Sequence, residues 1–297
     1  MTRIIAGTSN PKLAQQLSKD LNIKSTITHI KRFQDGELRI QIIDNIRDDD
    51  VIIVQSTSKP TNDNLIELLL LIDAAKHAGA NCITALIPYF GYSRQDKPSY
   101  PFGPVSARLV ATLLEATGAH HVITLDLHSQ HSEEFFKINI KNIDATALFI
   151  EPLKNRSNIV IVSPDSGGTT RARKLSELLK TDLAVINKTR QAPNICQMDK
   201  ITGNVSNHHC IIIDDIIDTG KTLCKATDLL VQCGALSVEA FASHAVLSGQ
   251  AASDLENSPL KKITITNSIT HENLPSKFEI LNIAPLFIQN LQKIIKN

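Results

Sequence analysis

Three acidic side chains stand beside a small polar turn in the second half of the chain. The apolar run Ile211–Ile213 leads into Asp214 and Asp215, and two residues later the run Asp218-Thr219-Gly220-Lys221-Thr222 begins. Free amide groups at a helix N-terminus bind phosphate, and threonine hydroxyls add donors. This is not a Walker A loop, which requires glycine at position 215. The segment predicts a sugar-phosphate site, and a capped helix after a surface acidic turn is the alternative.

Two further segments carry groups that could bind a metal ion associated with phosphates. Ser163-Pro164-Asp165 follows an apolar run and leads through two glycines into a stretch that bears Arg171. Asp165 is a candidate metal ligand, although the segment also fits an ordinary strand-to-helix turn. His128, which follows another apolar run, is a candidate magnesium ligand or catalytic base. Taken alone, it fits a buried hydrogen-bonding histidine better.

Polar residues also gather in two segments of the first half. Arg32–Glu37 places two acids and an aromatic ring on a turn, and its Asp-Gly pair also fits a simple hairpin. Pro88–Lys97 is a long loop with aromatic and charged residues, and loops after strands in this architecture usually carry function. Lys188 and Arg190, considered by themselves, are typical of solvated loop charges.

Short β-branched runs that alternate with helical stretches must position these groups. The runs are continuous in hydrophobicity, which is typical of parallel strands buried on both faces. They are Val51–Val54, Cys82–Ile87, Val122–Leu125, Ile159–Val162 and Ile211–Ile213. Helices are predicted over 62–79, 105–118 and 220–234, each ending at glycine. The pattern predicts an α/β fold in which largely parallel sheets are flanked by helices.

A domain boundary is predicted near residues 144–157, where a helical segment runs into polar residues and the alternation restarts. We therefore divide the chain into an N-terminal domain, 1–147, and a C-terminal domain, 148–297, which carries the acidic turn. A length of 297 residues fits two domains. Leu65–Ile72 is apolar nearly all round a predicted helix. This indicates either a helix buried within its domain or one that also lines a subunit interface.

The composition disfavours several classes of function. The 31 basic and 30 acidic residues give a net charge of +1, with no basic block and no tryptophan, so nucleic-acid binding is not expected. Five scattered cysteines without a C-x-x-C pair argue against a disulfide framework or a thiolate zinc site. No secretion signal and no membrane-spanning apolar stretch is evident, so a cytoplasmic setting is expected.

Taken together, these segments resemble ribose-phosphate pyrophosphokinases, the enzymes that make phosphoribosyl pyrophosphate. The resemblance covers almost the whole chain, from about Ile4 to about Leu291. It is carried by Phe33–Glu37, Val54–Thr57, Asn62–Leu69, Ile87–Asp96, Asp126–His128, Ser163–Asp165 with its Gly-Gly pair, Asp214–Thr222 and Ser243–Gly249. Each match is weak by itself, but the ordered set is highly specific.

The resemblance implies transfer of the pyrophosphoryl group of ATP to the anomeric hydroxyl of ribose 5-phosphate. It also implies two phosphoribosyltransferase-type domains with the active site between them, and a homo-oligomer whose ATP sites are shared between subunits. The implied roles are ATP binding by Phe33, Asp35, Gly36 and Glu37, which would reach a neighbour's site, and by Arg94 and Gln95; Mg²⁺ binding by His128 and Asp165; ribose 5-phosphate binding by Asp214, Asp215, Asp218, Thr219, Gly220, Lys221 and Thr222; and catalysis by Lys188 and Arg190.

The chain departs from this family at several positions. Lys221 stands where the family commonly has a second glycine, so the turn also resembles that of purine phosphoribosyltransferases. Lys97–Pro104 holds one basic residue where regulated members are rich in arginine, and their Ser-containing tail is missing. Weak or absent allosteric control is therefore expected. A phosphoribosyltransferase and a non-catalytic synthetase-associated subunit are the alternative functions.

Overall fold

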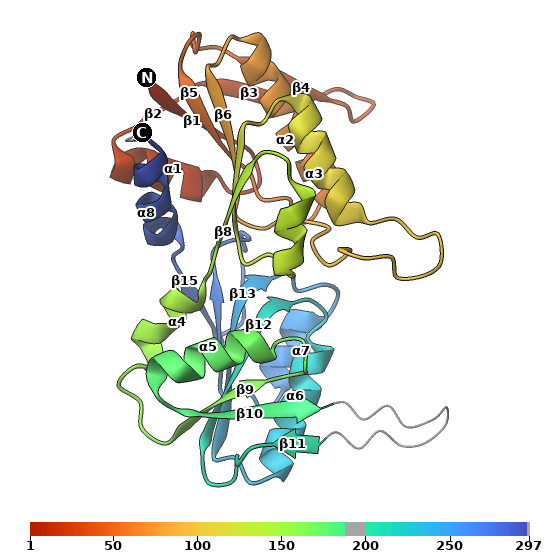
Figure 1. Cartoon of the computed structure of the whole chain (residues 1–297), viewed down its shortest axis with the longest axis vertical. Coiled ribbons are helices and arrows are strands. Elements are labelled where there is room, and N and C mark those ends of the chain that lie inside the picture. The colour runs from red at the N-terminus through yellow and green to blue at the C-terminus, as the bar shows by residue number, and fades with distance from the viewer. Residues whose placement is uncertain (188–199, 296–297) are drawn as a thin grey trace. The chain divides into compact units, whose positions relative to one another are not determined.

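A computed structural model of the chain describes residues 1–187 and 200–295 (Figure 1). Its contacts divide the chain into two units. Unit 1 holds residues 1–144, the short segment Ser268–Thr270 and the segment from Ile283 onwards; unit 2 holds Ala145–Asn267 and His271–Asn282. The units differ from the contiguous domains 1–147 and 148–297 expected from the sequence, because the chain returns to unit 1 near its C-terminal end.

Unit 1 is built on a six-stranded parallel sheet with the strand order β2-β1-β5-β6-β7-β8. The strands are β1 (Thr2–Ala6), β2 (Lys24–Ser25), β5 (Asp50–Val54), β6 (Cys82–Ile87), β7 (His121–Leu125) and β8 (Asn139–Ile143). The runs predicted at 51–54, 82–87 and 122–125 form three neighbouring central strands. Their apolar side chains are buried, as the prediction of parallel strands requires.

Helices flank this sheet, and a separate hairpin packs on one of them. The helices are α1 (Pro11–Leu21), α2 (Thr61–His77), α3 (Ser106–Thr117), the 3₁₀ helix η1 (Gln130–Phe135) and α8 (Ala284–Ile295). The hairpin strands β3 (Thr28–Arg32) and β4 (Leu38–Ile42) are antiparallel, and β4 lies against α2. Helix α8 packs against α1, and its Phe287 and Leu291 are buried (Figure 1).

Unit 2 is built on a seven-stranded sheet with the order β11-β10-β9-β12-β13-β14-β15, parallel except for the pair β10 and β11. Its strands are β9 (Ile159–Ser163), β10 (Asp182–Asn187), β11 (Lys200–Thr202), β12 (His209–Ile217), β13 (Ser237–Ala245), β14 (Lys262–Thr266) and β15 (Phe278–Leu281). Its helices are α4 (Thr146–Leu153), α5 (Thr169–Leu179), α6 (Lys221–Gln232) and α7 (Ala251–Asn257).

Strand β12 is longer than the apolar run Ile211–Ile213 that predicts it. It continues to Ile217, because Asp214, Ile216 and Ile217 keep parallel register with β13. Asp214 and Asp215 therefore belong to the last half of a strand, whereas the sequence places them directly after it. Only Asp218 begins the turn.

Each sheet contains one point where successive connections leave in opposite directions. In unit 1, β1 connects to β2 on one side while β5 connects to β6 on the other, so this point lies between β1 and β5. In unit 2 the same reversal lies between β9 and β12. Open α/β sheets bind ligands at the carboxyl ends of the strands at such switch points. The two switch points therefore define where to look for a site.

Candidate active site

The polar turn predicted to bind a sugar phosphate lies at the switch point of unit 2. Gly220 has φ 73°, a left-handed conformation that glycine adopts at little cost, and α6 begins at the next residue. No side chain caps α6, so its first amide groups are left for an incoming anion. Thr219, Lys221 and Thr222 are exposed beside these amides. A turn of this geometry is compatible with the predicted phosphate site, which stays a prediction.

Residues that follow β13, for which the sequence predicts no role, hold the backbone of this turn in place. Ser248, which follows β13, donates its amide hydrogen to the carbonyl oxygen of Asp218 at 3.0 Å. The amides of Val246 and Leu247 donate to the carbonyl oxygen of Ile217 at 2.8 and 3.1 Å. These donors follow the neighbouring strand β13, so the local sequence of the turn does not predict the contacts. The contacts hold the turn in place independently of the side chains of the turn.

Asp215 pairs with an arginine on the other side of the switch point. Arg171 lies in the first turn of α5 after β9, and its Nη1 is 3.3 Å from Oδ1 of Asp215, which is 6% exposed. A buried carboxylate needs such a partner. The sequence predicts that Asp215 binds the sugar, whereas this contact engages part of the carboxylate within unit 2.

Asp214 has a different environment from its neighbour. Burial, together with the negative charge of Asp215, raises the pKa of Asp214 from its ordinary value of 3.8 to about 8. A carboxyl group that keeps its proton near neutral pH can donate a hydrogen bond as well as accept one. The two adjacent aspartates therefore offer different hydrogen-bonding chemistry.

This raised pKa predicts a loss of stability as the pH increases. Between about pH 4 and pH 8 the folded chain holds a proton on Asp214 that the unfolded chain releases, so the free energy of unfolding falls as pH rises. Asp214→Asn removes that loss. The variant should be more stable than the wild type at pH 9, and this advantage should disappear near pH 4. Urea unfolding followed by circular dichroism at both pH values measures the difference.

The matched control for this measurement is Asp228→Asn, which changes an exposed carboxylate on α6 of the same unit. Its stability should follow that of the wild type at every pH. A constant difference between the Asp214→Asn variant and the wild type from pH 4 to pH 9 would contradict the assignment.

Asp165 follows β9 and stands at the other side of the same switch point. Its Oδ1 accepts a hydrogen bond from the amide of Gly168 at 3.1 Å, and its carbonyl oxygen accepts one from Ser163 Oγ at 2.7 Å. These contacts fix the loop between β9 and α5. The half-buried carboxylate is thus placed by local hydrogen bonds at a ligand-binding edge.

In unit 1 the predicted ATP-binding turn is the tip of the β3–β4 hairpin. Phe33, Asp35, Gly36 and Glu37 are all exposed. The amide of Glu37 donates to Asp35 Oδ1 at 3.0 Å, and the amide of Phe33 donates to the carbonyl oxygen of Glu37 at 2.8 Å. The segment forms the hairpin turn that its Asp-Gly pair predicts. Because the turn presents polar side chains to the outside, the hairpin is also compatible with the predicted ATP-binding role.

Arg94, Gln95 and His128 follow neighbouring strands of the unit 1 sheet. Arg94 and Gln95 lie in the loop after β6, and His128 follows β7. All three are exposed, so His128 is not the buried histidine that its sequence context favours by itself. Ser106 Oγ donates to Gln95 Oε1 at 2.6 Å, which holds this side chain against the start of α3. The carboxyl edge of the sheet brings these residues to one side of unit 1.

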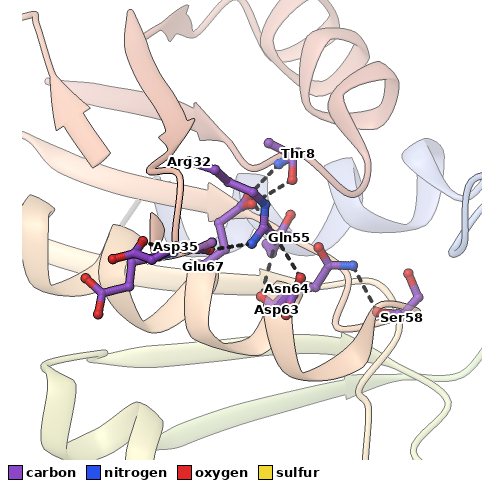
Figure 2. A network of polar contacts seen from close by, with 10 residues as sticks. Thr8, Arg32, Asp35, Gln55, Ser58, Asp63, Asn64 and Glu67 are labelled. Atoms are coloured by element: carbon purple, nitrogen blue, oxygen red, sulfur yellow. Dashed lines mark hydrogen bonds and ion pairs between the residues drawn. The ribbon is translucent and has the colours of Figure 1, made fainter. Parts of the chain in front are cut away.

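The switch point of unit 1 is filled by side chains of the unit itself. Glu67 on α2 is 2% exposed, and its carboxylate accepts hydrogen bonds from the amide and Oγ1 of Thr8, each at 2.6 Å, and from Gln55 Nε2 at 2.9 Å (Figure 2). A Cβ atom at Gly7 would lie 2.3 Å from Gln55 Oε1, so any larger residue there would displace the buried Gln55 side chain. The Thr8 amide is therefore already used, which makes the unit 2 turn the better phosphate site.

Lys188 and Arg190, the predicted catalytic cations, lie outside the described residues. The stretch from 188 to 199 connects β10 to β11. Their assignment stays a prediction from the sequence.

Comparisons with known proteins agree with the motifs. Residues 2–118 match the family model for the N-terminal domain of ribose phosphate pyrophosphokinase, and residues 110–278 match the phosphoribosyl transferase domain. Ribose-phosphate pyrophosphokinase from Ralstonia nicotianae is 42% identical, with 99% of this chain and 95% of the relative covered. The chain belongs to the ribose-phosphate pyrophosphokinase family. The relative from Helicobacter hepaticus, of the same name, is 41% identical, with 99% of this chain and 96% of the relative covered.

A solved structure supports the fold of this ribose-phosphate pyrophosphokinase family member over its full length. Phosphoribosylpyrophosphate synthetase from Mycobacterium smegmatis matches with a TM-score of 0.94 and 34% identity, and the match covers 100% of this chain and 99% of that one. The predicted α/β fold of two phosphoribosyltransferase-type domains is thereby confirmed. The full-length relatives also favour a pyrophosphokinase over a phosphoribosyltransferase.

Proposed function

We propose that this chain transfers the pyrophosphoryl group of ATP to the anomeric hydroxyl of ribose 5-phosphate, giving phosphoribosyl pyrophosphate and AMP. The observation that carries the proposal is an uncapped phosphate turn with three aspartates at the switch point of unit 2. It occurs in a chain that resembles curated pyrophosphokinases over almost its whole length.

In the proposed reaction the anomeric oxygen attacks the β-phosphorus of ATP. A new oxygen–phosphorus bond forms, the bond from the β-phosphorus to the α,β-bridging oxygen breaks, and its electron pair leaves with AMP. The hydroxyl proton is released. Such transfers need positioning and positive charge more than covalent chemistry by the protein. The turn Asp218–Thr222 positions the sugar phosphate, and Lys188 and Arg190 stabilise the charge that develops on the transferred and leaving groups.

We further propose that Mg²⁺ takes part, held by Asp165 and His128 together with ATP phosphates. Mg²⁺ commonly uses one or two protein groups and completes its shell with water and phosphate oxygens. The donor set fits this pattern in part: the Asp165 carboxylate is a preferred oxygen ligand, whereas an imidazole is a less usual one. When bound, the ion would neutralise phosphate charge and orient the nucleotide.

One assay tests the proposed function directly. The purified chain is incubated with ATP, ribose 5-phosphate and Mg²⁺, and AMP and phosphoribosyl pyrophosphate are measured by chromatography. Equal amounts of the two products are expected, and no AMP should form without the sugar phosphate. Formation of ADP instead of AMP, or no product at all, would contradict the proposal.

We also propose a homo-oligomer in a cytoplasmic setting. Helix α2 buries Leu65 and Leu68 within unit 1, yet Ile66 is 49% exposed and Leu70 is 36% exposed on its outer side. Apolar residues four positions apart lie next to each other on a helix surface, and such a pair supports a subunit contact. No helix within the described ranges could cross a membrane, and the cysteines seen there are free thiols.

Shared ATP sites would allow two inactive variants to restore activity when they are mixed. One variant carries Asp35→Ala and Glu37→Ala, and the other carries Lys188→Ala. After subunit exchange, about a quarter of the sites in a randomly mixed oligomer combine an intact turn with an intact Lys188. We expect about that fraction of wild-type activity from equal amounts of the two variants.

The control for this experiment mixes each inactive variant with a protein that carries all three substitutions, which cannot create an intact site. That mixture should stay inactive. The shared site would be contradicted if activity does not recover although subunit exchange has been verified. Full activity of a monomer at assay concentration would also contradict it.

A further inference from the structure

The first turn of α2 contacts two segments that are far apart in the sequence. Arg32, which precedes the hairpin turn, donates from Nη2 to Asp63 Oδ2 at 2.8 Å (Figure 2). Tyr92, in the loop after β6, donates its hydroxyl hydrogen to Oδ1 of the neighbouring residue Asn62. One turn of one helix thus contacts a residue next to each segment to which ATP binding is assigned, Phe33–Glu37 and Arg94–Gln95.

Burial cannot hold the hairpin turn in place, because every residue from Lys31 to Glu37 is exposed. The hydrogen bonds within residues 33–37 shape the turn without tying it to the rest of unit 1. Arg32 both shapes the turn and ties it to α2. Its Nη1 donates to the carbonyl oxygen of Gly36 at 2.9 Å, and its Nη2 donates to Asp63. Within residues 1–187 and 200–295, this ion pair is the polar contact that connects the turn to α2.

Tyr92 has a comparable place in the other segment. It has φ 68°, its carbonyl oxygen accepts a hydrogen bond from the amide of Gln95 at 2.9 Å, and Arg94 lies between these two residues. Thr57 Oγ1 accepts a hydrogen bond from the amide of Gly91 at 2.6 Å and fixes the start of the loop. The Tyr92–Asn62 contact therefore anchors the loop next to its predicted ATP-binding residues.

The helix that receives both contacts is itself firmly held. Four residues beyond Asp63, the buried Glu67 is bonded to Thr8 and Gln55 at the edge of the sheet. In addition, Asn64 Nδ2 donates to the carbonyl oxygen of Ser58 at 2.9 Å (Figure 2). The first turn of α2 is thus linked to the sheet by buried hydrogen bonds, which makes it a stable support for the exposed segments.

We propose that Asn62 and Asp63 are positioning residues that hold the two nucleotide-binding segments from one helical turn, with Arg32 and Tyr92 as their partners. This inference rests on the proposed function. Because the hairpin turn is proposed to serve a neighbouring subunit, the same helical turn would link a subunit's own nucleotide loop to the turn that it lends to its neighbour.

The chemistry of arginine is part of this inference. A guanidinium donates along several fixed directions and can bind a carbonyl and a carboxylate at once, whereas an ammonium acts as a point charge. An exposed ion pair adds little to stability, so its loss should leave the chain folded. A small displacement of a substrate-binding group from its proper position can nevertheless reduce binding and turnover strongly.

The test measures KM for ATP and for ribose 5-phosphate in Arg32→Ala, Arg32→Lys, Asp63→Ala and Tyr92→Phe. We expect KM for ATP to rise roughly tenfold in Arg32→Ala and roughly threefold in Tyr92→Phe, while KM for ribose 5-phosphate stays within about twofold. Arg32→Lys should recover only part of the loss. The control is Arg39→Ala, which removes the same charge from an exposed position of the same hairpin and should behave as the wild type.

A double-mutant cycle decides between a specific contact and a general disturbance. The variant with both Arg32→Ala and Asp63→Ala should show the same KM for ATP as either single variant, because each change removes the same contact. The inference would be overturned if the rises in KM for ATP of the two single variants multiply in the double variant, or if both KM values rise equally. It would also be overturned if the variants lose the folded state at assay temperature, or if Arg39→Ala has the same effect as Arg32→Ala. Absence of AMP production by the wild type would instead refute the proposed function.

Discussion

Replacing Lys188 or Arg190 by alanine is expected to lower turnover by roughly 10²-fold or more in each case. The transferred group and the departing AMP gain negative charge in the transition state, and fixed cations stabilise that charge more than they stabilise the bound substrates. The KM values for ATP and ribose 5-phosphate should therefore change much less than turnover. The family resemblance implies a catalytic role for both residues, which lie outside the described residues.

Steady-state kinetics on the purified variants measure this effect. Lys200→Ala is a suitable control, because it removes an exposed cation from β11, close to the same stretch of chain. Its turnover should stay near that of the wild type. Near-normal turnover in both Lys188→Ala and Arg190→Ala would contradict the catalytic assignment.

Asp218→Ala is expected to weaken the binding of ribose 5-phosphate by roughly 10-fold to 150-fold, which is the range for lost hydrogen bonds to a charged group. ATP affinity should change by less than about threefold, because Asp218 belongs to the sugar site in this assignment. The turn should keep its shape in the variant, since Ser248 donates to the backbone carbonyl oxygen of residue 218 and not to its side chain.

Separate calorimetric titrations with ribose 5-phosphate and with ATP test this prediction. Asp228→Ala removes an equivalent charge from the exposed face of α6 and should leave both affinities unchanged. A collapse of ATP affinity with normal binding of the sugar phosphate would show that the site is wrongly assigned.

The sequence predicts the central strands of both sheets because each is a continuous β-branched run. Residues 82–87 form β6 with the predicted bounds, and residues 51–54 form all but the first residue of β5. The helices predicted over 105–118 and 220–234 are α3 and α6, each shorter by one or two residues at its ends. Local hydrophobicity and glycine carry this information, so local rules suffice for it.

Interactions between distant segments could not be predicted in the same way. The pairing of Arg171 with Asp215 joins residues 44 positions apart, and the contact of Arg32 with Asp63 joins residues 31 positions apart. Neither has a local pattern, because each depends on which elements pack next to each other. The extension of β12 through two aspartates also depends on its partner β13, since acidic residues are otherwise depleted in strands.

Helix α8 determines in which order the two units can be completed during protein synthesis. It belongs to unit 1 and packs against α1, yet the ribosome makes it after all of unit 2. Domains usually fold in the order in which they emerge. Here the nascent unit 1 must wait, with the surface that α8 will cover still exposed, until residues 145–282 have been made. Unit 2 can therefore reach its final fold before unit 1 is complete.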